Sequence, residues 1–340
     1  MDRVTSYGDM DGGTAGRATT VMEETARHYN NISKYAQVHE MPLHSGDTLK
    51  FKRYADWAVT DSPLSETIDP TFLQPTFEEA EVTVEEYGQA VQLTRKIKLM
   101  HEDPLFQIQM KKAGKAAAQC SLKVDFNALK AGTNVSYAGT ATTRVSVDAA
   151  VSNNALKKVV RQLEEDGIEP ISEVVPASTG IGTEPVPEAY RALVHTHQRA
   201  DLEALEGWLP VHAYPNQSGI DVKELGECEG IRFIANREAP IWKAAGASST
   251  TWLSNGSKVS SAASADVYPI IVIGQDSWAR VPLAGTSAKN ANLKPIVLLP
   301  KPQAGDVLGR RGSVAWCGWF AALITWEDGV HRLETAVTAL

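Results

Sequence analysis

Several features are scarce or missing in this chain of 340 residues. Cysteine occurs at only three positions, Cys120, Cys228 and Cys317, without CxxC spacing. This argues against a disulfide framework or a cysteine zinc site and favours reduced thiols in an intracellular setting. No stretch approaches the roughly 18 consecutive apolar residues of a membrane-spanning helix, and the N-terminus lacks the apolar run of a signal peptide. The sequence therefore predicts a soluble protein with no membrane partner.

An excess of positive charge is also missing. The 33 lysines and arginines are outnumbered by 41 aspartates and glutamates, which leaves a formal net charge of -8. A dedicated nucleic-acid binder usually has a basic face, so this balance argues against that class but still allows local contact with DNA. The hydrophobic share of 43% is typical of globular proteins. A chain of this length buries a sizeable core.

Sequence motifs that support catalysis are absent as well. The chain contains neither a GxxxxGK[ST] or GxGxxG phosphate loop nor a GxSxG elbow. Only His195-Thr196-His197 has a spacing that suggests metal binding, as in the HxH pair of metal-dependent hydrolases. A metal centre needs further ligands, and no acidic cluster accompanies this pair. We therefore predict no catalytic residue, cofactor or metal, with a hydrolase as a remote alternative.

The first half of the chain shows a weakly patterned segment followed by clear alternation. Residues 1–45 are polar and cannot by themselves bury enough apolar area to offset their ordering entropy. Composition favours a disordered tail, and an arm that becomes ordered only against neighbouring subunits is the alternative. Apolar residues at every second position then predict strands over 48–54, 82–84 and 91–99. Such a hairpin has no core of its own and needs a surface to lie on.

The clearest helix follows this hairpin. Asp103 suits the N-cap, Pro104 the first helical position and Gly132 the stop, which gives a helix about 40 Å long. The three lysines at 111, 112 and 115 indicate a solvated face. The predicted apolar stripe comprises Phe106, Met110, Ala113, Ala117, Cys120, Val124 and Ala128.

The second half of the chain predicts an α+β arrangement with mostly antiparallel strands. A helix over 152–166 ends at Gly167, and a shorter one is expected over 199–205. Strands are predicted over 190–195, 231–235, 267–273 and 296–299. A buried strand over 314–325 is expected to continue into a hairpin across Asp328-Gly329.

Short motifs in a fixed order resemble those of tailed-phage major capsid proteins, whose fold is the Hong Kong 97-type coat fold. They are GDTLKFKRY at 46–54, PLSE at 63–66 with DP at 69–70, VEEYG at 84–88, AGTNVSYAG at 131–139, GIRF at 230–233, DVLGRRG at 306–312, WFAA at 319–322 and RLE at 332–334. Thr67, Val307 and Arg310 depart from the family's usual residues, as in a divergent member.

The resemblance implies an α+β, Hong Kong 97-type phage capsid fold with four parts. An N-terminal arm would cover residues 1–45, and an extended β-hairpin loop with peripheral-domain strands 46–100. A long spine helix with the peripheral domain would cover 101–147, and an axial domain with return strands to the peripheral domain 148–340. The implied function is that of a non-enzymatic major capsid protein, which self-assembles into hexamers and pentamers of an icosahedral virion shell around double-stranded DNA.

The resemblance also implies partners. These are further copies of the chain, a portal protein, scaffolding and decoration proteins, and packaged DNA bound non-specifically, with assembly in the host cytoplasm. Lys50, Lys52, Arg53 and Glu66 are our candidates for ion pairs between subunits. The alternative with the same architecture is an encapsulin, the shell protein of a bacterial nanocompartment.

Overall fold

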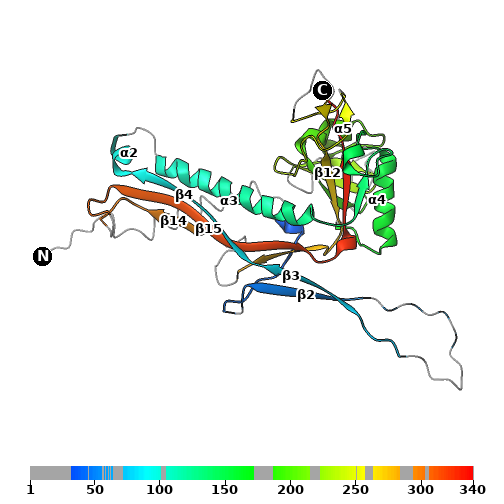
Figure 1. The fold of residues 1–340 in the computed structure, drawn as a ribbon, viewed down its shortest axis with the longest axis horizontal. Coiled ribbons are helices and arrows are strands. Elements are labelled where there is room, and N and C mark those ends of the chain that lie inside the picture. The colour runs from blue at the N-terminus through cyan, green and yellow to red at the C-terminus, as the bar shows by residue number, and fades with distance from the viewer. Residues whose placement is uncertain are drawn as a thin grey trace.

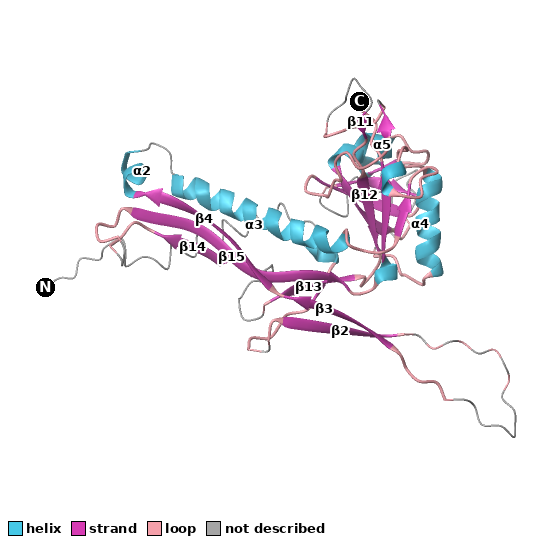
Figure 2. Ribbon diagram, viewed as in Figure 1, coloured by secondary structure: helices cyan, strands magenta, loops and turns pink. Residues whose placement is uncertain are grey.

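Two sheets that share no strand organise the molecule (Figure 1). The computed structural model describes residues 32–44, 46–55, 57, 59, 61, 63, 72–100, 105–171, 187–214, 223–249, 251–256, 263–283, 294–302 and 306–339. Figure 2 shows an extended part in which a long helix runs beside long strands, and a separate part in which helices surround a second sheet. We call these parts the limb and the head.

The limb is built on the longest strand of the structure, β15 (Arg311–Ile324). This strand pairs with β4 (Glu85–Thr94) along one edge, and with β14 (Lys294–Leu298) and β13 (Trp278–Pro282) along the other. The short strand β1 (Gln37–Val38) adds to β13 in parallel. The helices of the limb are α2 (Arg95–Met100) and α3 (Leu105–Leu129). Small residues let α3 approach the sheet closely, and its Ala117 packs on Trp316.

The head contains a seven-stranded sheet that is buried on both faces. Its strands, in spatial order, are β5 (Val135–Tyr137), β16 (Val330–Thr335), β12 (Tyr268–Ile273), β6 (Tyr190–His195), β9 (Ile231–Asn236), β8 (Glu224–Cys228) and β7 (Leu209–Pro210). Ala192 and Val194 belong to the cluster under α4 (Asn153–Glu165), whereas Leu193 points to the other face and packs with Phe126 of α3. This alternation follows from the two-residue period of a strand.

The remaining elements of the described chain are short. They are α5 (Arg199–Glu203), the strand pair β10 (Ser248–Ser249) and β11 (Ala263–Ser264), and single turns of 3-10 helix at Ser33–Tyr35, Arg144–Ser146, Thr196–Gln198, Val211–Ala213 and Glu327–Gly329. The helix predicted over 152–166 is confirmed as α4, whose first turn is capped by the Ser152 hydroxyl accepting from the Ala155 N–H.

The hairpin predicted from the alternating segments is present and projects from the body (Figure 1). Its strands β2 (Thr48–Tyr54) and β3 (Phe77–Thr83) pair along their whole length, from Thr48 opposite Thr83 to Tyr54 opposite Phe77. Leu49 and Phe51 pack on the limb sheet beside Val281. The hairpin therefore has a rooted end, and its other end extends beyond the body.

Three sequence predictions were wrong in detail. Residues 95–99 form helix α2 rather than a strand, because β15 begins opposite Thr94 and offers no further partner. Strands β15 and β16 form no hairpin, since the turn at Glu327–Gly329 leads the chain from the limb sheet into the head sheet. Of the apolar stripe predicted for α3 only Ala117 is buried, and the buried face includes Leu122, Phe126 and Leu129 instead, because this helix packs on the head as well as on the limb sheet.

The described part of the N-terminal segment also differs from expectation. Residues 32–44 lie against their own chain, although composition favoured a disordered tail and the alternative was an arm that becomes ordered only against neighbouring subunits. Ile32 is fully buried in the cluster that joins α3 to the head, and Met41 is buried beside the limb sheet. A few well-placed apolar residues thus anchor a segment whose average composition is polar. The earlier residues of the predicted arm lie outside the described chain.

Candidate functional site

The predicted contact residues of the hairpin lie on two different faces. Lys50 forms an ion pair with Glu81 at 3.0 Å, and Lys52 forms one with Glu79 at 2.9 Å, both across the strand pair within the chain. The hydrogen bond to Glu81 raises the pKa of Lys50, and the one from Lys52 lowers the pKa of Glu79. These pairs form a ladder of alternating charge on the solvent face of the hairpin.

Arg53 lies on the opposite face of β2, in line with Leu49 and Phe51. Its guanidinium lies 3.5 Å from the centroid of the Trp326 ring, which places a cation over an aromatic face. Trp326 lies between β15 and β16, where the chain passes from limb to head. Arg53 therefore links the hairpin to this junction. Glu66, the fourth predicted contact residue, lies outside the described residues.

The distal half of the hairpin exposes large apolar side chains. Tyr54 and Phe77 meet edge to face with ring centroids 6.1 Å apart, and both remain at least half exposed. Beyond them, Trp57 is 71% exposed and Phe72 is 94% exposed. Burial of an aromatic side chain is strongly favourable, so these groups mark a surface suited to docking on another molecule.

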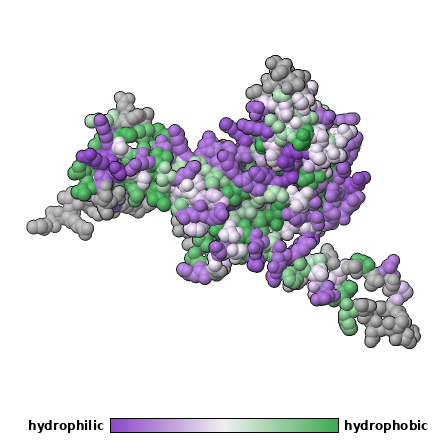
Figure 3. Space-filling view, in the orientation of Figure 1, coloured by the Kyte–Doolittle hydropathy of each residue, from purple (hydrophilic) through white to green (hydrophobic). Residues whose placement is uncertain are grey.

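A second apolar surface lies at the far end of the limb, where Figure 3 shows hydrophobic residues gathered together. Its exposed members are Val91, Ile97, Leu99, Met100, Ile296, Leu298, Val307 and Leu308. Basic residues accompany them, including Arg95 and Lys96 at the start of α2. The hairpin strand β3, by contrast, contains three glutamates over 78–81, and two more stand at 85–86 at the start of β4.

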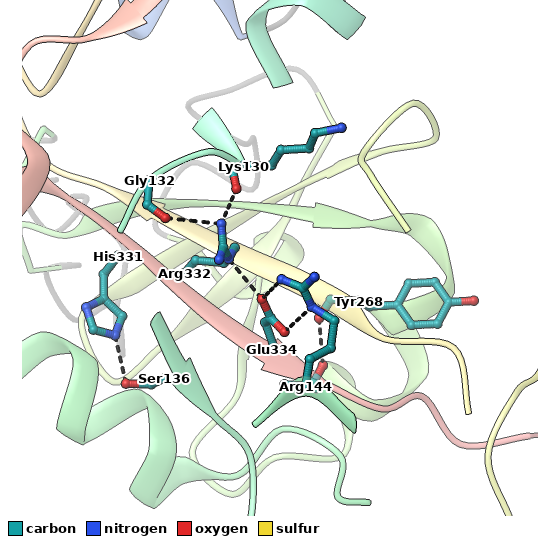
Figure 4. Close-up of polar contacts among 9 residues, drawn as sticks. Lys130, Gly132, Ser136, Arg144, Tyr268, His331, Arg332 and Glu334 are labelled. Carbon is teal, nitrogen blue, oxygen red and sulfur yellow. Dashed lines mark hydrogen bonds and ion pairs between the residues drawn. The ribbon is translucent and has the colours of Figure 1, made fainter. Parts of the chain in front are cut away.

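The C-terminal end of α3 is fixed to the head by a buried ionic cluster (Figure 4). Glu334 is fully buried and accepts two hydrogen bonds from Arg144, both at 2.7 Å, and one from Arg332 at 3.0 Å. Arg332 also donates to the carbonyls of Lys130 and Gly132, which lie just beyond the end of the helix. The hydrogen bonds to Glu334 raise the pKa of Arg144, whereas burial lowers the pKa of Arg332.

The histidine pair considered for metal binding caps a turn. The Nδ1 atom of His195 accepts the backbone N–H of His197 at 3.1 Å, and Nδ1 of His197 lies 2.9 Å from the Tyr268 hydroxyl. Burial lowers the pKa of His195 to about 4. Among the described residues, no group of three or more His, Cys, Asp or Glu side chains could hold a metal ion. None of the helices that the structure describes is long and apolar enough to span a membrane.

Comparison with known proteins gives a result at the level of structure only. No protein-family profile and no curated protein matches the sequence. The capsid of Ralstonia phage GP4 superposes with a TM-score of 0.64 at 12% identity, over 91% of this chain and 92% of that one. The capsid of cyanophage Pam1 gives 0.58 at 14% identity, over 90% and 92% of the two chains. This chain has the phage capsid fold.

The capsid fold is shared by a shell protein of another kind. An encapsulin complex from Synechococcus elongatus superposes with a TM-score of 0.51 at 8% identity, over 88% of this chain and 85% of that one. Its agreement is weaker than that of the phage capsids. The resemblance read from the ordered sequence motifs is thus confirmed for the fold.

Within the capsid fold, sequence reasoning missed two buried charged clusters. Arg332 and Glu334 were recognised only as part of a motif, and their partner Arg144 was not singled out. Asp125, which lies 3.5 Å from Arg280, was also missed. Asp125 follows Ser121 by one helical turn on α3, and two polar residues on an otherwise apolar face are the signal that could have indicated a buried partner.

Proposed function

We propose that this protein is a major capsid protein, the subunit that self-assembles into hexamers and pentamers of an icosahedral virion shell around double-stranded DNA. One observation carries the proposal: the likeness to the Ralstonia phage capsid covers nine tenths of both chains. Coverage this wide includes the projecting hairpin and the extended limb, which a protein that works as a monomer would not need. The proposal is structural, and assigns no catalytic role to any residue.

Surface chemistry supports the same function. The hairpin ends in exposed aromatic side chains, and the limb ends in exposed apolar ones. In a monomer both surfaces remain in contact with water, which is unfavourable in free energy. Contacts with neighbouring copies would bury both. Head-to-tail contacts of this kind generate closed rings of identical subunits. We assign the ends of the hairpin and limb to such contacts, with Lys50, Lys52, Arg53 and Glu66 as candidate contact residues.

Further partners follow from the proposed function. A shell that packages DNA requires a portal protein, and scaffolding and decoration proteins are further partners of the same class. Contact with DNA would be non-specific and limited to local basic patches, because the chain as a whole carries a net negative charge and DNA phosphates are negative as well. The assembled protein would be located in the virion, with assembly in the host cytoplasm.

Electron microscopy of the purified chain tests the proposal. We expect rings or closed shells, together with sedimenting species many times heavier than the subunit. A protein that remains monomeric across a range of concentrations and salts would contradict it. The contents of the particles distinguish the encapsulin alternative when the chain is expressed together with its neighbouring genes. An enclosed protein cargo would favour a nanocompartment, whereas DNA-filled particles would favour a virion.

A further inference from the structure

The sheet edges of the described chain are unequally protected. An open edge offers unpaired N–H and C=O groups to any extended chain, and proteins usually shorten, charge or cover such edges. The head sheet ends in β5 and β7, which have three and two residues. On the limb, β14 has five residues and includes Pro295, which has no N–H to donate. These edges offer little for another strand to pair with.

The outer edge of β4 is different. This strand has ten residues and contains no proline, lysine or arginine. One edge pairs with β15 from Glu85 to Thr94, and no strand in the described part of the chain pairs with the other. Most of its residues are exposed. It is therefore the longest open edge among the described strands, and from residue 87 to residue 94 it contains neither proline nor the charged residues that usually block pairing.

The charges at the two ends of β4 complement each other. The strand begins with Glu85 and Glu86, and Arg95 and Lys96 follow directly after its last residue. Antiparallel pairing of two β4 strands centred on Ala90 would bring Glu85 of each copy close to Arg95, the first residue of α2, of the other. Opposite charges across strands stabilise a pairing, whereas a parallel arrangement would bring like charges together.

We propose that the open edge of β4 is an interface between two copies of this chain, in which the two β4 strands pair antiparallel around a two-fold axis. The same patch serves both partners, as in any contact around such an axis. Main-chain hydrogen bonds would join the limb sheets of the two copies into one continuous sheet. The pairing itself needs only two copies. Its role in joining neighbouring rings of a shell rests on the proposed function.

Single cysteines near the centre of β4 provide the test. Gln89→Cys, Ala90→Cys and Val91→Cys are introduced one at a time into the full-length protein, which is oxidised and run on non-reducing gels. A residue on the two-fold axis faces its own copy within disulfide range, so at least one of the three variants should run as a cross-linked dimer. Glu86→Cys is the matched control, because antiparallel pairing places it opposite the far end of the strand. The parent chain is oxidised in the same way and shows how much cross-linking arises from the three native cysteines.

The outcomes separate this interface from the proposed function. Absence of a dimer from all three central variants would overturn the interface, as would equal cross-linking of Glu86→Cys. Shells without the cross-link would reject the interface and retain the function. A cross-linked dimer that forms no shells would support the interface and reject the proposed function.

A charge exchange provides a second test, in the variant that cross-links best. Replacement of Glu85 and Glu86 by lysine should abolish most of the dimer band, as should replacement of Arg95 and Lys96 by glutamate. All four changes together should restore it, because the complementary charges are then re-formed in reverse. Glu164→Lys with Glu165→Lys, at the exposed end of α4 in the head, is the control and should leave the band unchanged. Failure of the fourfold variant to recover, with its fold intact by circular dichroism, would count against the pairing.

Discussion

Asp125 is a buried carboxylate on the face of α3 that packs against the rest of the chain. It lies fully buried on α3, 3.5 Å from the Arg280 guanidinium and 3.4 Å from the Ser33 hydroxyl. Its Oδ1 atom has no hydrogen-bond partner. Burial raises its pKa to about 6, although Arg280 and Ser33 both oppose the shift. This single residue therefore joins three separate segments, the anchored N-terminal segment, the long helix and β13.

The raised pKa of Asp125 predicts a pH-dependent contribution to stability. The folded protein keeps this proton up to about pH 6, whereas the unfolded chain loses it near the ordinary value of 3.8. The folded state therefore binds more protons between these values, and stability decreases as pH rises through this window. Over this pH window, we expect the free energy of unfolding of the parent protein to fall by up to about 3 kcal/mol more than that of Asp125→Asn.

Urea unfolding of both proteins at several pH values between about 4 and 7 measures this difference. The comparison must be between the two proteins, because buried His331, whose pKa is lowered to about 4, produces the opposite trend in the same window. That trend is common to both proteins and cancels in the difference. Identical pH profiles for the parent and the variant would show that Asp125 does not titrate in this way.

At the scale of elements, the two faces of the hairpin should respond differently to substitution. Arg53→Ala removes the contact with Trp326, which is worth about 1 kcal/mol for a partly exposed cation over an aromatic ring. We expect faster hydrogen exchange in β2 and β3, because the hairpin is then held only at its root. Lys50→Ala is the matched control and should leave exchange nearly unchanged, since its ion pair with Glu81 is exposed. Equal effects of the two variants would contradict the assignment.

Arg53→Glu extends this comparison to assembly. A reversed charge next to Trp326 should lower the yield of particles while the isolated chain remains folded. Particle counts by electron microscopy and circular dichroism of the unassembled protein measure the two effects. An unchanged particle yield would show that the direction of the hairpin has no role in assembly.

Elements with a clear local signal could be predicted from the sequence, and contacts between distant segments could not. Alternation, apolar runs and capping residues identify β2, α4 and the three central strands of the head, β6, β9 and β12, because each signal lies within a few neighbouring residues. The face on which Arg53 lies also follows from its position two residues after Phe51. Its partner Trp326 cannot be predicted in this way, since nothing local to either residue indicates that β2 meets the junction between the two sheets. The contact between Arg144 and Glu334 could not be predicted for the same reason.

At the scale of the whole molecule, the exposed end of the hairpin should matter for assembly and little for folding. Trp57→Ser combined with Phe72→Ser removes two apolar side chains that are exposed in the single chain. We expect little change in the free energy of unfolding and a large loss of particles, because burial of these side chains would occur only on contact with another copy. Val145→Ser, at an exposed site in the head, is the control.

Analytical ultracentrifugation of the double variant, the control and the parent protein measures this loss. The double variant should sediment mainly as small species under conditions in which the other two form particles. Normal assembly of the double variant would remove the hairpin end from the contact surface.

The parallel pairing of β1 with β13 has a consequence for synthesis on the ribosome. Gln37 and Val38 are made early, but their partners Ala279 and Arg280 emerge only when most of the chain has been translated. The core around Ile32 likewise waits for Trp278, and contacts between such distant residues form late in folding. During translation, the anchored segment and the limb sheet therefore cannot complete their contacts until most of the chain has been synthesised.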